Sequence, residues 1–116
     1  MQTYGMTLML QDDPDKIRRY KRHHREVWPE VAAKLREIGV REMRIYLLGR
    51  RMFMHMETVE GFDPLRDFRR AMEDPRYRAW EDLMHSLQER APEAAGDVWW
   101  APMEEVFDLR WSDRGE

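Results

Sequence analysis

The segment from Tyr20 to Glu30 carries the side chains of this sequence that are best suited to acid–base chemistry. Tyr20, His24 and Trp28 recur every four positions, so in a helix they share one face. Histidine titrates near neutral pH and can give or take a proton, while tyrosine offers a hydrogen bond and tryptophan an apolar plane. The spacing fits a site built around His24, and it equally fits a core in which His24 is a buried, hydrogen-bonded histidine.

Other reaction chemistries find little support in the sequence. The chain has no cysteine, so thiolate nucleophiles and disulfides are excluded. Its two serines, Ser86 and Ser112, do not lie in a glycine-flanked elbow, and no glycine-rich phosphate loop occurs. The adjacent histidines His23 and His24 would point about 100° apart on a helix, so we expect neither a metal site nor a cofactor.

Carboxylates and tryptophans elsewhere allow more than one interpretation. Asp74 before Pro75 is typical of a helix N-cap followed by proline in the first turn, which is a structural role. Trp99 and Trp100 lie in a segment rich in small residues, where they can line a pocket or cover a partner's surface.

Length and composition indicate one small, well-solvated domain. The 116 residues are 42% hydrophobic and 37% charged, with a net charge of −3 and acidic and basic residues intermixed. This distribution argues against a nucleic-acid partner, and no apolar run is long enough to cross a membrane. With no signal peptide visible, we expect a cytoplasmic protein, with residues 1–110 as a single domain and 111–116 as a polar tail.

The first half of the chain predicts a strand followed by a helical region. Residues 4–11 are apolar and end at a turn, where Asp13 suits an N-cap and Pro14 a first helical position. Apolar residues then recur at helical spacing from Ile17 to Ile38. Pro29 must kink this helix or begin a second one, and Gly39 suits its C-terminal cap.

The second half predicts a hairpin, more helix and a last strand. The expected strands are 42–48, 52–58 and 103–109, and the expected helices are 64–73 and 75–90. The resulting β–α–β–β–α–β order is that of a ferredoxin-like α+β sandwich, an antiparallel sheet with helices on one face. Since both hairpin faces carry apolar side chains, we expect the second face to meet another subunit, enclose a pocket, or both.

The string Tyr20…His24…Val27-Trp28-Pro29-Glu30 resembles the L-rhamnose mutarotase family. The likeness extends from Thr7 to Leu109 and includes the Asp74…Arg78…Trp80 helix and the closing Glu105-Val106-Phe107.

The resemblance implies a ferredoxin-like homodimer that interconverts the anomers of a 6-deoxy monosaccharide. It further implies His24 as the proton donor, with Tyr20 and Trp80 binding the sugar. Two positions depart from the family pattern, because Met43 replaces a sugar-binding tyrosine and Ala79 the first of two tandem tryptophans.

Tyr46 and Trp28 complete the sugar-binding residues that we expect. Tyr46 or the tryptophans of the 91–102 segment can make up for the groups lost at Met43 and Ala79.

Two other functions remain open on the sequence. Small ferredoxin-like dimers include cofactor-free monooxygenases and cyclases that act on aromatic or polyketide-like substrates, which the many methionines and tryptophans would suit. The third hypothesis is a non-catalytic binding module in which His24 is structural.

Overall fold

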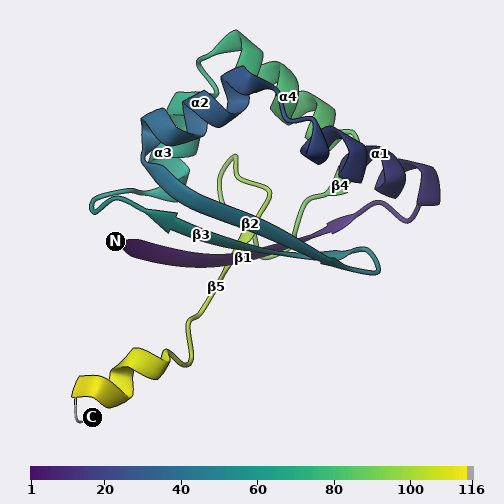
Figure 1. The fold of residues 1–116 in the computed structure, drawn as a ribbon. Coiled ribbons are helices and arrows are strands. Elements are labelled where there is room, and N and C mark those ends of the chain that lie inside the picture. Colours follow the sequence, from purple (N-terminus) through teal and green to yellow (C-terminus); the bar gives the residue numbers. More distant parts are fainter. Residues whose placement is uncertain (115–116) are drawn as a thin grey trace.

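The computed structural model describes residues 1–114 as one α+β domain, with its α-helices on one side of a single sheet (Figure 1). The strands are β1 (Gln2–Leu10), β2 (Val40–Leu48), β3 (Arg51–Thr58), β4 (Gln88–Glu89) and β5 (Ala101–Met103). The helices are α1 (Pro14–Arg25), α2 (Pro29–Ile38), α3 (Pro64–Ala71) and α4 (Pro75–His85), followed by a 3₁₀ helix, η1 (Leu109–Arg114). Within residues 1–114, no helix is both long and apolar enough to span a membrane.

Local sequence explains where the helices begin. The side chains of Asp13, Asp63 and Asp74 each accept hydrogen bonds from two backbone amides of the following turn. In each case a proline occupies the first helical position, where no amide hydrogen is required. The N-caps predicted at Asp13 and Asp74 are therefore confirmed.

The helical region from Ile17 to Ile38 is two helices. Pro29 opens α2 after a break at residues 26–28, which settles the choice between a kink and a restart. Gly39 ends α2 with φ of +115°, a left-handed conformation that favours glycine. A Cβ atom there would approach Val59 Cγ2 to 2.8 Å.

The sheet has the ferredoxin-like order β2-β3-β1-β4, and β5 also pairs with β1. All of its pairings are antiparallel. The fourth strand of this fold is thus present as two short pieces, β4 and β5, and the loop between them carries Trp99 and Trp100. The helix predicted at 75–90 ends at His85, since β4 begins at Gln88.

The prediction of a strand at 103–109 is wrong. Pairing with β1 runs from Ala101 to Met103 and stops opposite Gly5. The chain then leaves the sheet on the side away from the helices and ends in η1 (Figure 1). Residues 111–114 of the predicted frayed tail lie in η1, and Gly115 and Glu116 lie outside the described residues.

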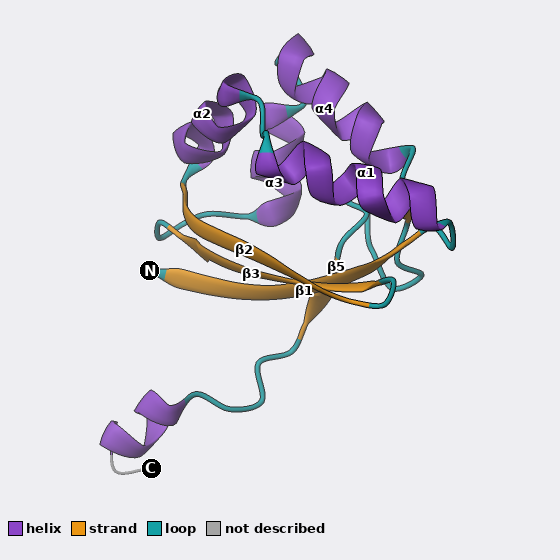
Figure 2. Cartoon of the chain, turned by 45° about the vertical axis from the view of Figure 1, so that its right-hand side comes forward, coloured by secondary structure: helices purple, strands orange, loops and turns teal. Residues whose placement is uncertain are grey.

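The core lies between the sheet and the helical layer (Figure 2). Met52, Met54 and Met56 of β3 are buried, as are Met6 and Leu8 of β1, because alternate residues of a strand point to the same face. The opposite face of the sheet carries no helix in either view.

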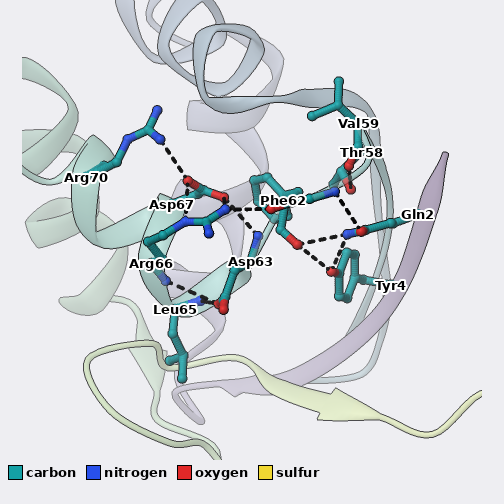
Figure 3. A network of polar contacts seen from close by, with 11 residues as sticks. Gln2, Tyr4, Thr58, Val59, Phe62, Asp63, Leu65, Arg66, Asp67 and Arg70 are labelled. Carbon is teal, nitrogen blue, oxygen red and sulfur yellow. Dashed lines mark hydrogen bonds and ion pairs between the residues drawn. The ribbon is translucent and has the colours of Figure 1, made fainter.

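A polar network fixes the start of α3 against β1 (Figure 3). The buried carboxylate of Asp67 accepts hydrogen bonds from the Asp63 amide at 2.8 Å and from the Arg66 guanidinium at 3.0 Å. The hydrogen bonds from Arg66 hold the pKa of Asp67 below its usual value. Nearby, the Gln2 amide donates to the Phe62 carbonyl at 2.8 Å. These contacts position α3, whose inner side contributes to the cavity described below.

Candidate active site

A cavity of about 690 Å³ lies between the helices and the sheet. Its size is within the range of small-molecule binding sites, about 300–1,000 Å³. A second cavity of about 450 Å³ shares part of its wall. Five side chains line both cavities: Tyr20, His24, Leu35, Met43 and Ile45.

His24 lies in this shared wall, held by its own helix. Its Nδ1 is 3.0 Å from the carbonyl oxygen of Tyr20, one helical turn earlier. A carbonyl oxygen only accepts, so Nδ1 carries a proton and the neutral ring keeps its lone pair on Nε2. Burial lowers the pKa of His24 below its ordinary value. Near pH 7 the ring is therefore a neutral base in a cavity wall.

Two aromatic rings fix the orientation of His24. The Tyr20 ring stacks on the imidazole with centroids 4.2 Å apart, and Trp80 meets it edge-on at 5.4 Å. Tyr20 is buried, which raises the pKa of its hydroxyl, and that hydroxyl hydrogen-bonds to the side chain of Gln88. Tyr20 thus keeps a neutral hydroxyl in the cavity lining, and its role in binding sugar stays a prediction.

The two tryptophans predicted to bind sugar, Trp80 and Trp28, do not line the larger cavity. Trp80 is 4% exposed, belongs to the hydrophobic core and lines only the smaller cavity. Trp28 packs edge-on against Trp80 at 5.2 Å, is covered by the Arg76 guanidinium at 3.7 Å and lines neither cavity. Trp80 thus packs against His24, and Trp28 packs against Trp80, while their role in binding sugar stays a prediction.

Tyr46 lies on the opposite face of the sheet. It is 54% exposed and stacks on Phe53 at 6.3 Å. Its neighbours Ile45 and Leu47 point to the helical side, and strand alternation sends Tyr46 the other way. Within one chain it cannot reach the cavity, so it does not compensate for Met43, which does line it.

The sequence reasoning missed a group of polar cavity residues on α4 and β4. They are Tyr77, Glu81 and His85 of α4 and Gln88 of β4. Tyr77, Glu81 and His85 recur every four positions and so share one helix face, beside the apolar stripe of α4. That spacing is the same signal that singled out Tyr20 and His24.

The segment between β4 and β5 forms another wall. Trp99 and Trp100 both line the cavity, and Trp99 stacks on His85 at 3.8 Å with the rings 5° from parallel. The two tryptophans were predicted to line a pocket or to cover a partner's surface, and in the single chain they line the cavity.

Methionine side chains make up much of the remaining surface of the cavity. Five line it: Met6, Met43, Met54, Met72 and Met84. The cavity thus combines an adaptable apolar part with the polar groups of α1 and α4. Among residues 1–114, no group of three or more histidines or carboxylates could hold a metal ion.

The model of the L-rhamnose mutarotase family matches residues 3–109. The chain belongs to this family. The finding confirms the resemblance drawn from the segment around His24, and it makes the protein a sugar mutarotase, an isomerase.

A curated relative agrees with this assignment, and a solved structure shares the fold. The chain is 40% identical to the L-fucose mutarotase of Xanthomonas campestris over 111 residues, which cover 94% of this chain and 89% of the relative. The solved L-rhamnose mutarotase of Formosa agariphila superposes with a TM-score of 0.69 at 21% identity, over 94% of this chain and 99% of that one.

The same fold serves another activity. Tetracenomycin F2 cyclase from Streptomyces glaucescens, a type-II polyketide cyclase, superposes with a TM-score of 0.66 at 13% identity, over 94% of this chain and 99% of that one. At that identity the likeness shows the fold alone. It confirms the ferredoxin-like fold class, and it does not favour the cyclase hypothesis over the mutarotase family.

Proposed function

We propose that this mutarotase interconverts the α and β anomers of a 6-deoxyhexose, L-fucose or L-rhamnose, with His24 as its acid–base residue. The observation that carries the proposal is the neutral imidazole of His24 in the cavity wall, held with Nε2 unprotonated by the Tyr20 carbonyl. Mutarotation needs a proton taken from the anomeric hydroxyl and a proton given to the ring oxygen. The sugar opens to an aldehyde, the C1–C2 bond rotates, and the ring closes on the other face of the carbonyl.

His24 can take part in both directions of this reaction. In the opening step Nε2 accepts the proton of the anomeric hydroxyl, and in the closing step the imidazolium returns it. His24 thus acts as the proton donor in one half of each turnover. General acid–base catalysis of this kind is typically worth about 10²–10⁴-fold.

The make-up of the cavity supports a 6-deoxy sugar. A pyranose of this class has several hydroxyl groups and one methyl group. The hydroxyls can bond to Tyr20, Gln88 and the polar groups of α4, while the methyl group can contact the methionines. The L-fucose mutarotase among the relatives adds support, because the similarity covers almost the whole chain.

Paired sugars test this substrate class. L-Fucose and L-galactose differ only in a methyl against a hydroxymethyl group at C5, as do L-rhamnose and L-mannose. An unpartnered hydroxyl placed against apolar side chains costs about 1–3 kcal/mol. We therefore expect kcat/KM for anomer exchange, measured by NMR, to be roughly 10–100-fold higher for one of the 6-deoxy sugars than for its hydroxymethyl partner. Equal rates within both pairs would refute the 6-deoxy proposal and leave a less selective mutarotase.

We also propose that the protein works as a homodimer. The open sheet face exposes Tyr46, Phe53 and Leu48, the last of which is 83% exposed. Beyond β5 the departing segment exposes Val106 and Phe107, the latter 68% exposed. Apolar groups gathered on one side of a small domain indicate an interface.

Light scattering after size exclusion should give the mass of two chains. The double variant Val106→Asp, Phe107→Asp should shift that mass toward one chain, because charged groups are costly in an apolar interface. Its circular dichroism should stay unchanged, since both residues lie outside the core cluster. A wild-type protein with the mass of one chain would contradict the dimer.

A further inference from the structure

Glu81 is a carboxyl group in the lining of the same cavity as His24. It lies on α4, on the same helix face as Tyr77 and His85, which are four positions before and after it. The Tyr77 hydroxyl hydrogen-bonds to its carboxyl group, and His85 Nε2 lies 3.6 Å from Glu81 Oε2. Its side chain is 29% exposed, so the carboxyl can be reached from the cavity.

The surroundings of Glu81 provide little compensation for a negative charge. Burial, with a smaller contribution from the neighbouring Asp82, raises its pKa to about 7. Burial also lowers the pKa of His85, so this ring is neutral at pH 7 and forms no ion pair with Glu81. Tyr77 faces the carboxyl as a neutral hydroxyl, because burial raises its pKa well above the ordinary value.

Groups on the other walls do not change this balance. From α1, Tyr20 and His24 face the cavity as uncharged groups. Arg69 of α3 lines the cavity but pairs with Asp97 at 3.1 Å. Two further charged residues of the lining, Glu73 and Arg78, are exposed and of opposite sign. Glu81 is therefore close to half protonated at neutral pH, the state in which a carboxyl group can both give and take a proton.

Glu81 and His24 border the same cavity and are linked through Tyr20. The Tyr20 ring stacks on His24, and the charge of Glu81 raises the pKa of the Tyr20 hydroxyl. A sugar ring that touches Tyr20 in this cavity is thus within the surroundings of both groups. Burial acts on the two groups in opposite directions, since it lowers the pKa of His24 and raises that of Glu81, so that near neutral pH His24 can accept a proton while Glu81 can donate one.

We propose that Glu81 is the second proton-transfer group of the site and donates to the ring oxygen while His24 accepts from the anomeric hydroxyl. The proposal rests on the mutarotase function proposed above. In the opening step the C1–O5 bond breaks, and its electron pair stays on O5, which takes the proton of Glu81. The anomeric O–H bond breaks toward His24 Nε2, and its electrons form the C1=O1 double bond.

Closure restores both groups. The open aldehyde leaves behind an imidazolium at His24 and a carboxylate at Glu81, so the net charge of the site is unchanged. After rotation about C1–C2, O5 attacks the other face of C1 and returns its proton to Glu81, while O1 takes the proton of His24. No oxidant, metal or additional reactant is needed.

Glu81→Gln tests the role of the carboxyl group. The amide keeps the shape and an acceptor for Tyr77 but has no proton to transfer. We expect kcat for L-fucose or L-rhamnose to fall about 10²–10⁴-fold, with KM within a few-fold of wild type. Wild-type activity should decline as pH rises through about 7, because Glu81 then loses the proton that it donates, and this alkaline limb should be absent in the variant.

Two further variants control the experiment. Asp82→Asn removes a carboxylate from the adjacent, exposed position outside the cavity lining, and kcat should stay within about threefold of wild type. Because Asp82 contributes to the raised pKa of Glu81, the alkaline limb should remain but move to a lower pH. Glu81→Asp keeps a carboxyl group in the cavity and should retain an alkaline limb, even if kcat falls.

The outcomes separate this proposal from the proposed function. An active wild type together with a Glu81→Gln variant that keeps both its rate and its alkaline limb would overturn the role of Glu81 and leave His24 in place. A folded wild type that accelerates anomer exchange of no sugar would overturn the proposed substrate class and the role of Glu81 together.

Discussion

Replacing His24 with alanine should lower kcat for anomer exchange by at least about a hundredfold while the protein stays folded. The imidazole is half-buried, and its Nδ1 bonds to the Tyr20 carbonyl of its own helix. Alanine frees that carbonyl without creating a buried charge, and it favours the helix. The stability loss is then limited to the contacts with Tyr20 and Trp80, about 1–2 kcal/mol.

The neighbouring histidine provides a matched control. His23 lies on the same helix but lines neither cavity, and its ring meets the edge of Trp80 at 6.4 Å. His23→Ala should keep kcat within about threefold of wild type. If the His24→Ala variant unfolds, or if the variant stays folded with undiminished kcat, His24 is a structural histidine. That outcome would favour the alternative interpretation, a buried and hydrogen-bonded histidine of the core.

Acid should reduce activity through the same residue. Protonation removes the Nε2 lone pair, and burial lowers the pKa of His24 below its usual 6.5. The acid limb of the wild-type pH profile should therefore lie below pH 6.5, and it should disappear in whatever residual activity His24→Ala retains.

The second large effect concerns stability. Trp80→Ala should reduce the free energy of unfolding by about 3–5 kcal/mol, the usual cost of removing a large aromatic side chain from a core. Trp80 is almost fully buried and packs against His24 and Trp28. For a domain of this size the melting temperature should fall by more than about 10 °C, measured by circular dichroism or calorimetry.

A comparison with Trp28 separates packing from sugar binding. Trp28→Ala removes a half-buried ring under Arg76 and should cost clearly less than Trp80→Ala. Trp80→Phe should recover much of the stability and, since Trp80 does not line the larger cavity, leave KM within a few-fold of wild type. A stable Trp80→Phe variant with a strongly raised KM would instead assign Trp80 to the sugar, as the family resemblance implies.

Local signals in the sequence predicted most of the elements. Aspartate caps followed by proline gave the starts of α1 and α4, Gly39 the end of α2, and alternation the hairpin of β2 and β3. These features depend on a few neighbouring residues. The end of the last strand depends instead on residues far away in the sequence. β5 stops where its pairing with β1 stops, opposite Gly5.

The same distinction holds for the site. His24 and Tyr20 stood out because four-residue spacing on one helix is visible in the sequence. Glu81 and Gln88 join them only once α4 and β4 pack over the sheet. For Tyr46, the sequence could have excluded the prediction. Alternation along β2 puts Tyr46 on the face opposite to Ile45 and Leu47, and therefore away from the cavity.

Saturation-transfer NMR between the anomer signals of L-fucose and of L-rhamnose, with catalytic amounts of wild-type protein and of His24→Ala, tests the central claim most directly. We predict accelerated exchange for at least one sugar with the wild type, and an acceleration at least about a hundredfold smaller with the folded variant. Exchange that is no faster than without protein for both sugars, or equally fast with the variant, would contradict this account.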